Sequence, residues 1–527
     1  MKPDDLQKAL AGLVKQQYKT EVEPLITAAD PKFGDYTSNV AFQLAGRLKK
    51  SPGEIAQQLA DNFNDPDLAG IEATPSGYLN MTLPDQYWVA QLPAIDKHYG
   101  RSKMGNGTKV QIEFISANPT GPTTIGNARG GFIGDILSRV YESQGYDVTR
   151  EYYFNNAGTQ IGKLVESVKV SAGLIKVKAE DVQYRGAYIE DLAKEFKAKL
   201  KDMTDDEAGK LLTDAILKRY IEPAIKKMGI KFDVWFNESN LIKDGSLDDV
   251  IKRLKAKKLI FERDGAVWLD TKKLGVKREE RVLIKSNGDP TYLAPDIAYH
   301  DDLFRKRGFD RSITVLGADH VDQFPSVKAA TLELNPDKQM DIVACQWFHI
   351  IKDGKEVKVS KRSGQFVTIE ELIEETGEPV ARFFTIMRSN DSGVDFDINL
   401  AKEQSQKNPY HYVMYSYVRA QSILAKAKTK HLKPLAMTDL VGVERRLVRQ
   451  MTAFPAVLDQ IVSDFGVHRL TFYGQELAGT FHEFYETVPI LSDKGPQVQK
   501  RLSLVSHFAQ LMEAYWSVLG ITPIDKM

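Results

Sequence analysis

The chain has 527 residues, of which 42% are hydrophobic and 27% are charged, and its formal net charge is zero. This composition is typical of a folded protein of several domains, and it excludes both a disordered chain and one whose overall basic charge indicates a nucleic-acid partner. The single cysteine, Cys345, excludes an internal disulfide and a cysteine-rich zinc site. There is no apolar run of the roughly 20 residues that a membrane span needs, and no signal peptide pattern, so we expect a cytoplasmic protein.

The first 100 residues or so predict a small α+β domain. A helix pattern covers about Thr37 to Lys49. The next helix opens at Ser51, with proline at its first position and Glu54 placed to complete a capping box. A short strand is expected from Gly77 to Leu83, and the polar stretch Tyr99 to Thr108 is a plausible linker.

Strand and helix patterns alternate in the middle of the chain. An apolar strand at Val110–Ser116 leads into a glycine-rich turn, then a helix that ends near Gly145, then a strand at Val148–Phe154. This order predicts a parallel sheet with right-handed crossovers. Later strands of the same sheet are expected at Ile313–Leu316 and Ile342–Ile350.

The domain organisation follows from these patterns. The sequence predicts a multidomain α/β protein with an N-terminal α+β domain at 1–100 and a Rossmann-like parallel-sheet domain at 105–400. A charged, helical stretch at about 162–264 is expected to be an insertion into that sheet domain. From 401 to 527 the patterns are helical without strand signals, which predicts an all-α helical bundle.

Residues 113–130, EFISANPTGPTTIGNARG, run from the end of a strand through a turn rich in glycine and proline into a helix. Free N–H groups and the positive end of the helix dipole favour an anion at such a point. An ordinary tight turn between a strand and a helix would have the same composition, and the residues alone do not separate the two interpretations.

A second segment, KVSKRSG at 358–364, places three cations and two hydroxyl groups within seven residues. Such a loop can close over a triphosphate and stabilise charge on a leaving pyrophosphate. Taken alone, it is also what a solvated basic loop looks like.

Together, TTIGN on the first turn and KVSKRSG more than 200 residues later resemble the paired nucleotide signatures of class I aminoacyl-tRNA synthetases. Within that class the chain resembles the arginyl-tRNA synthetases over nearly its whole length. The resemblance is carried by GDYTSNVAFQLA, EFISANPTGP, REYYFNNAGTQI, PTYLAPDIAYHDDLF with GADH, NPYHYVMYSYVRAQSIL and the ending PIDKM.

The resemblance implies an arginine–tRNA ligase that forms arginyl-adenylate from ATP and arginine and passes the arginyl group to tRNA(Arg). It implies a catalytic role for Thr124, Asn127, Lys358, Ser360 and Lys361. It implies ATP binding by Pro122, Thr124, Gly126, Asn127, Lys358 and Lys361. ATP is expected with Mg²⁺, without zinc or any metal held by the protein, in a monomer with no membrane partner.

The residues that match the family's arginine pocket are Glu113, Ser116, Asn118, Tyr292, Asp296 and His320. Their chemistry suits a guanidinium, which carries a permanent charge and five donors in a plane. Asp296 can accept two parallel charge-assisted hydrogen bonds from it, and Glu113 with Asn118 can hold the α-amino group. Without the family match, Asp296 could equally be a helix cap and Tyr292 a core residue.

The sequence departs from the usual pattern at the first signature, where Thr124 and Asn127 stand in place of two histidines. Both keep hydrogen-bonding capacity but cannot carry an imidazolium charge. Because tryptophan-specific members of the class use a similar TIGN version, one rival hypothesis is a different amino-acid specificity. Another rival is a non-catalytic tRNA-binding paralogue, although the lysine-rich loop is intact.

For tRNA, the stretch 419–438 carries five cations and no acid, which fits a phosphate-contacting surface as well as a solvated helix end. Four tyrosines, at 410, 412, 415 and 417, precede it, and half of them must face the bundle core. The resemblance implies that this bundle binds the anticodon and that the N-terminal domain contacts the tRNA elbow. The predicted tRNA contacts are Tyr415, Arg419, Lys426 and Lys428.

Overall fold

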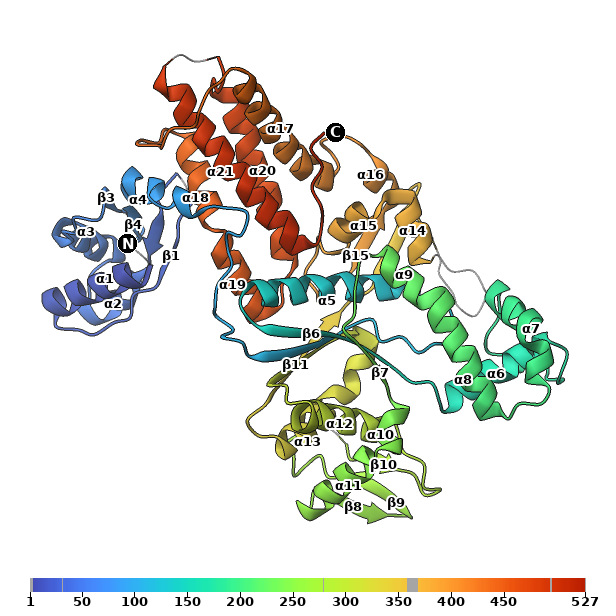
Figure 1. The fold of residues 1–527 in the computed structure, drawn as a ribbon. Helices are drawn as coiled ribbons and strands as arrows, with labels where there is room; N and C mark the ends of the chain where they lie inside the picture. Colours follow the sequence, from blue (N-terminus) through green and yellow to red (C-terminus); the bar gives the residue numbers. More distant parts are fainter. Residues whose placement is uncertain (1–2, 31, 278, 358–367, 493–494, 527) are drawn as a thin grey trace.

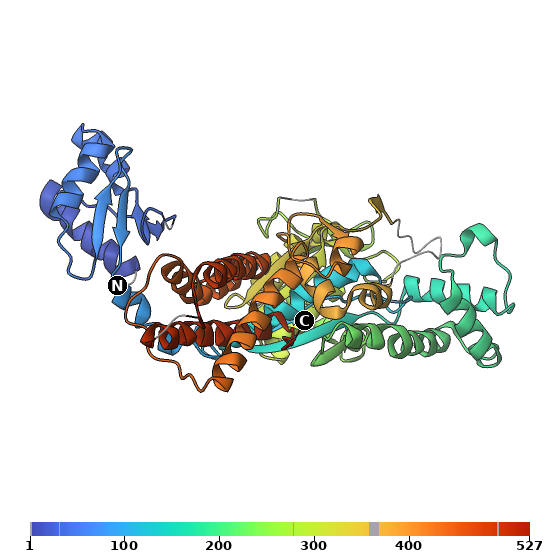
Figure 2. The same cartoon turned by 90° about the horizontal axis from the view of Figure 1, so that it is seen from above.

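The protein is described by a computed structural model, which covers residues 3–30, 32–277, 279–357, 368–492 and 495–526. Figures 1 and 2 show an elongated molecule, with the N-terminal domain at one end and a group of helices from the middle of the chain at the other. The parallel sheet lies between them, and the C-terminal bundle packs beside it.

The N-terminal domain combines an antiparallel sheet with helices, in agreement with the predicted α+β class. Its elements are α1 (Pro3–Tyr18), β1 (Ile26–Ala28), β2 (Tyr36–Ser38), α2 (Val40–Leu48), α3 (Pro52–Asn62), β3 (Gly70–Ala73) and β4 (Leu79–Thr82), and the strand order is β1-β2-β4-β3. The predicted capping box of α3 is confirmed, because Ser51 Oγ accepts from Glu54 N at 3.3 Å and the Glu54 carboxylate accepts from Ser51 N at 3.0 Å.

A connector runs from this domain to the sheet. It contains α4 (Asp85–Val89) and η1 (Leu92–Ala94). Trp88, Leu92 and Ile95 are buried in the hydrophobic core that the sheet domain shares with the bundle. The connector is therefore fixed to the body of the molecule rather than extended into solvent.

The central sheet has five parallel strands in the order β12-β11-β5-β6-β7. They are β5 (Lys109–Glu113), β6 (Asp147–Phe154), β7 (Val234–Asn237), β11 (Arg311–Gly317) and β12 (Gln339–Cys345). The chain leaves β5 toward β6 and β7 on one side, and later returns to β11 and β12 on the other. The strand order thus reverses between β5 and β11, and ligands of open parallel sheets bind at the carboxyl ends of the strands at such a point. Helix α5 (Ile125–Ser143) follows β5 and is buried along most of its length.

The crossover from β6 to β7 is a long helical segment. It contains α6 (Thr159–Ser171), η2 (Ala179–Asp181), α7 (Ala187–Leu200), α8 (Asp205–Ile216), η3 (Leu217–Ile221) and α9 (Glu222–Lys227). This segment forms the far end of the molecule in Figure 2. The range 162–264, predicted as one insertion, therefore contains a helical crossover and then β7, a strand of the central sheet.

Between β7 and β12 the chain builds a second core on the opposite side of the sheet from the bundle (Figure 1). Its antiparallel sheet has the order β10-β9-β8. The elements are α10 (Ser239–Lys243), α11 (Ser246–Ala256), β8 (Ile260–Arg263), β9 (Ala266–Leu269), β10 (Arg281–Ile284), α12 (Leu293–Asp301), η4 (Asp302–Lys306), η5 (Ala318–Gln323) and α13 (Phe324–Leu334).

The strand predicted at Ile342–Ile350 is two strands in the structure. β12 ends at Cys345, and β13 (Phe348–Lys352) pairs instead with β14 (Lys355–Glu356) and β15 (Val394–Asp397). The single-strand prediction was wrong because the apolar pattern continues across the break, so the sequence gives no sign of it. Helices α14 (Ile369–Thr376), α15 (Glu378–Thr385) and α16 (Ile398–Lys402) complete this region.

The C-terminal region is the predicted helical bundle: α17 (Pro409–Thr429), α18 (Val443–Thr452), α19 (Phe454–Asp464), α20 (His468–Thr487) and α21 (Pro496–Leu519). A buried ion-pair network joins it to the sheet domain. Arg382, fully buried, donates to Asp135 on α5 at 2.5 Å and to Leu519 O on α21 at 3.3 Å. Burial alone would raise the pKa of Asp135, but Arg382 and Arg139 hold it below its usual value.

Candidate active site

The turn after β5 has an unusual backbone. Ile115 and Ser116 both have left-handed φ angles, +69° and +39°. Such a conformation is costly for a β-branched isoleucine, and strain of this kind collects at ligand sites. The turn is held against β6, because Ser116 Oγ accepts from Tyr153 N at 3.2 Å and Asn118 Oδ1 accepts from Asn155 N at 3.1 Å.

Helix α5 begins within this turn. Thr124 is its N-cap residue, and Asn127 Oδ1 accepts from both Thr124 N, at 3.3 Å, and Thr124 Oγ1, at 3.1 Å. The two residues that replace the signature histidines therefore bond to each other and cap the helix. Pro122 lies in the turn just before them, and Gly126 is exposed in the first helical turn.

The first described residue after the second signature segment pairs with the first signature. Lys358, Ser360 and Lys361 lie outside the described residues. The next described residue, Thr368, forms an isolated bridge with Thr124 and caps α14. Thr368 thus lies beside the start of α5, although the two positions are far apart in the sequence.

Three carboxyl groups gather at the carboxyl ends of the central strands: Glu113 at the end of β5, Glu238 directly after β7, and Asp296 in α12. Burial, together with the nearby charge of Glu151, raises the pKa of Glu113 to about 7. Burial and the charges of Glu238 and Glu113 raise the pKa of Asp296 well above its ordinary value. Burial also raises the pKa of Glu238. A cation bound here would relieve this cost, so the site suits a positively charged ligand.

Polar partners hold these carboxyl groups in place. Glu238 accepts from the Tyr153 hydroxyl and from Asn155 Nδ2, both at 2.5 Å. Asp296 accepts from Gln323 Nε2 at 2.7 Å. The sequence prediction did not include Glu238 or Gln323. A carboxylate shortly after the apolar run VWF was the available signal for Glu238, but that run lay within the predicted insertion.

The remaining predicted pocket residues lie nearby in the fold. Tyr292 is the residue before α12, one turn from Asp296, and its side chain is 60% exposed. Its exposure excludes the core role that the residues alone left open. His320 lies in η5, directly after β11, and its side chain is outside the described part of the structure.

The described residues contain no group of three or more His, Cys, Asp or Glu side chains arranged to hold a metal ion. Within the same described ranges, none of the helices is both long enough and apolar enough to span a membrane.

Arg419 forms a cluster with aromatic residues on the surface of the bundle. Its guanidinium lies 4.6 Å from the ring centre of Tyr415 on α17 and 4.1 Å from that of Tyr485 on α20. It also bonds to the Tyr415 hydroxyl, at 3.2 Å. Lys426 and Lys428 are exposed further along α17. Of the four tyrosines of α17, those at 410 and 417 are buried, as the pattern required.

Comparison with protein families identifies each region of the chain. Residues 89–395 match the model for "tRNA synthetases class I (R), catalytic domain". Residues 3–83 match the "Arginyl tRNA synthetase N terminal domain", and residues 413–527 match the "DALR anticodon binding domain". With the parallel sheet and the turn after β5, these matches define a class I aminoacyl-tRNA synthetase.

Individual relatives agree over nearly the full length. The arginine–tRNA ligase of Desulfotalea psychrophila is 37% identical, over 94% of this chain and 93% of its own. That of Geobacillus kaustophilus is 36% identical, over 98% of this chain and 100% of its own. The chain belongs to the arginine–tRNA ligase family, whose reaction joins arginine to tRNA with ATP.

Solved structures share the fold. A putative arginyl-tRNA synthetase from Campylobacter jejuni superposes with a TM-score of 0.74 at 28% identity, covering 84% of this chain and 99% of its own. The Thermus thermophilus arginyl-tRNA synthetase superposes with a TM-score of 0.74 at 21% identity, over the whole of both chains.

Proposed function

We propose that the carboxyl groups of Glu113, Glu238 and Asp296 form the arginine pocket of this ligase. The observation that carries the proposal is their convergence, since each has a pKa above its ordinary value. Two cationic groups of arginine, the guanidinium and the α-ammonium, offset this clustered negative charge. A neutral side chain of the same shape would leave the carboxyl groups unpaired, which is a strong basis for selectivity.

Asp296 is the proposed partner of the guanidinium. Gln323 holds one carboxylate oxygen at 2.7 Å and so fixes the orientation of the group. A planar guanidinium can then donate two parallel hydrogen bonds to it. Tyr292, exposed at the start of α12, covers the bound side chain. His320, whose side chain lies outside the described part of the structure, stays a predicted arginine contact.

Glu113, Ser116 and Asn118 are proposed to hold the amino-acid end of arginine. They belong to the strained turn after β5, which is tied to β6 by the hydrogen bonds of Ser116 and Asn118. The arginine carboxylate would then face the start of α5, where ATP phosphates are expected. Attack of the carboxylate on the α-phosphate needs this alignment of the two substrates.

ATP is proposed to bind over the N-terminus of α5. The first turn of a helix favours an anion, and the side chains of Thr124 and Asn127 can exchange their mutual hydrogen bonds for bonds to phosphate or ribose. Pro122 and Gly126 are proposed to line the phosphate site. Lys358 and Lys361, which lie outside the described residues, are proposed to contact the same phosphates.

The proposed reaction has two steps. The arginine carboxylate attacks the α-phosphate in line and displaces pyrophosphate, while Lys358 and Lys361, with Ser360 between them, stabilise the charge that develops on the leaving group. A hydroxyl of the terminal ribose of tRNA then attacks the adenylate carbonyl and releases AMP. Mg²⁺ would enter with the ATP phosphates and contribute further charge neutralisation there.

Two regions are proposed to hold the tRNA. On the bundle, Arg419 and Tyr415 present a flat cationic and aromatic surface suited to anticodon bases, and Lys426 and Lys428 suit phosphates. On the N-terminal domain, exposed Phe42 and Tyr78 form an aromatic pair with ring centres 5.1 Å apart, which suits contact with the elbow. We further propose that the enzyme acts as a monomer in the cytoplasm.

The pocket is tested by Asp296→Asn, with Asp289→Asn as the matched control. Asp289 is exposed in the turn before α12, so its substitution makes the same change of side chain outside the pocket. Losing two charge-assisted bonds should raise the KM for arginine by roughly two orders of magnitude, with little effect on the KM for ATP. An arginine KM that Asp296→Asn leaves at the wild-type value contradicts the assignment.

A further inference from the structure

The N-terminal domain has a hydrophobic core of its own, which includes Leu10, Val40 and Ile55. The rest of the protein is built around other cores, and the connector after β4 is buried in the largest of them. The orientation of the N-terminal domain is therefore set where it meets the bundle. Figure 1 shows this junction beside α18.

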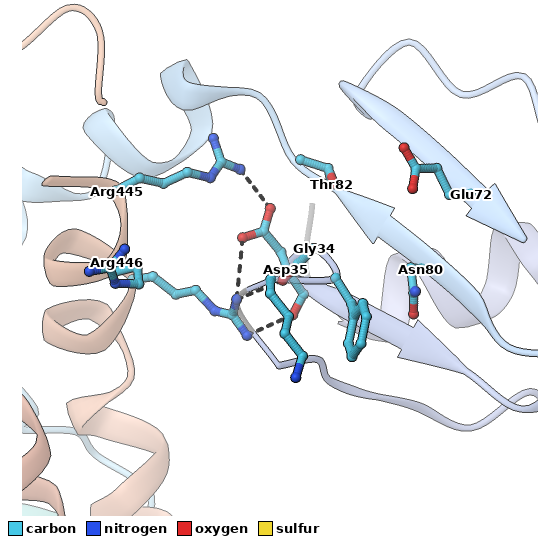
Figure 3. Close-up of a pocket in the computed structure, with 10 residues that line it drawn as sticks. Gly34, Asp35, Glu72, Asn80, Thr82, Arg445 and Arg446 are labelled. Carbon is cyan, nitrogen blue, oxygen red and sulfur yellow. Dashed lines mark hydrogen bonds and ion pairs between the residues drawn. The ribbon is translucent and has the colours of Figure 1, made fainter. Parts of the chain in front are cut away.

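Asp35 is the central residue of the junction. It lies in the loop between β1 and β2, and its side chain is 3% exposed. Its carboxylate accepts from Leu83 N at 2.7 Å and from Arg445 Nη2, on α18, at 2.7 Å. Arg445 also donates to Leu83 O at 2.6 Å and pairs with Asp85 in the connector. Figure 3 shows Asp35 facing Arg445 across the domain boundary.

Arg449 holds the same loop one helical turn further along α18. It donates to Gly34 O at 2.7 Å, to Asp35 O at 3.1 Å and to Ala29 O. Because residues four apart lie on one helix face, Arg445 and Arg449 approach the loop side by side. Their rigid planar donor sets fix direction as well as distance. We refer to Asp35, Arg445 and Arg449 as the Asp35 bracket.

Packing at this junction is incomplete beside the bracket. A cavity of about 240 Å³ lies between the two units, lined on one side by Lys32, Phe33 and Asn80 and on the other by α18. Along this side the two units are thus held by the polar bracket rather than by close apolar packing. Arg446 lines the same cavity (Figure 3). Its guanidinium pairs with Glu483 of α20, which belongs to the bundle like Arg446 itself.

We propose that Asp35, Arg445 and Arg449 are positioning residues that fix the spacing between the two tRNA-binding units. This inference rests on the proposed tRNA contacts of the N-terminal domain and the bundle. When the bundle holds the anticodon, the N-terminal domain binds the same tRNA molecule intramolecularly. The effective concentration for this second contact depends on the spacing between the two units. Loss of the bracket allows the N-terminal domain to reorient and removes most of the affinity gained from the second contact. The active site is not changed.

The test uses the full chain with Asp35→Asn and Arg449→Gln, and with Arg446→Gln as the matched control. The dissociation constant is measured for full-length tRNA and for an isolated anticodon stem-loop, together with kcat at saturating tRNA. Each bracket variant should raise the constant for full-length tRNA roughly tenfold. The stem-loop constant and kcat should stay at wild-type values, and Arg446→Gln should behave as wild type throughout.

Unchanged affinity for full-length tRNA in the bracket variants would overturn the inference. So would an equal loss of affinity for the stem-loop, because that result indicates general destabilisation of the bundle. If the Asp35→Asn protein does not fold, Arg445→Gln tests the same contact, because the Arg445 side chain is less deeply buried than that of Asp35. A wild-type chain that does not arginylate tRNA would instead count against the proposed function, so the two failures are distinguishable.

Discussion

Arginine affinity should rise with pH through neutrality, and Glu113 is the residue whose titration is best defined. Its pKa in the free protein is about 7, against an ordinary value of 4.5, because it is buried and close to Glu151. Bound arginine, which stays cationic across this range, favours the ionised form. Binding therefore lowers this pKa and releases protons, so that affinity increases as pH rises toward and just beyond 7.

The size of the effect follows from these two pKa values. If bound arginine returns Glu113 to its ordinary pKa, binding at pH 7 releases about half a proton from this group. The dissociation constant then falls roughly tenfold between pH 6 and pH 8 from Glu113 alone. Because Asp296 and Glu238 also have raised pKa values, the observed change should be at least this large.

Isothermal titration calorimetry in buffers of different ionisation enthalpy measures both the proton release and the affinity. Glu113→Gln should weaken binding and flatten its pH dependence, whereas Glu262→Gln, an exposed carboxylate in β8, should do neither. Wild-type protein that binds arginine equally at pH 6 and pH 8, without proton release, would refute the reasoning.

Three further substitutions test the ATP and tRNA sites. Lys361→Ala should lower kcat for arginylation about 100-fold, whereas Lys355→Ala, an exposed lysine in β14, should leave it unchanged; equal rates would remove the lysine from the mechanism. Thr124→Ala should destabilise the start of α5 by about 1 kcal/mol and raise the KM for ATP, and a wild-type KM would argue against phosphate contact. Arg419→Ala should raise the KM for tRNA at unchanged kcat, which steady-state kinetics would detect or exclude.

Much of the architecture was readable from the sequence because the local signals were strong. The helix at Ser51 had a complete capping box, and β5, α5 and β6 followed one another with clear periodicity and a glycine-rich turn. The place of the candidate site followed from the same order, since the turn after β5 lies at the carboxyl edge of a parallel sheet.

The parts that were missed depend on long-range packing. β7 has four residues, too few for a periodic pattern, so the sheet strand that places Glu238 beside Tyr153 was taken as insertion. The antiparallel strands β8 to β10 are equally short. The Asp35 bracket joins residues more than 400 positions apart. Nothing in the sequence around Asp35, or around Arg445 and Arg449 on α18, indicates that contact.

The central claim is that clustered carboxyl groups select a guanidinium for attachment to tRNA. The most direct measurement is aminoacylation of tRNA(Arg) by the purified chain with arginine, lysine or citrulline. Citrulline has nearly the shape of arginine, but its side chain carries no charge. Arginine should be attached efficiently, lysine and citrulline at rates lower by at least three orders of magnitude. Citrulline attached at a rate near that of arginine, or no arginylation at all, would contradict the account.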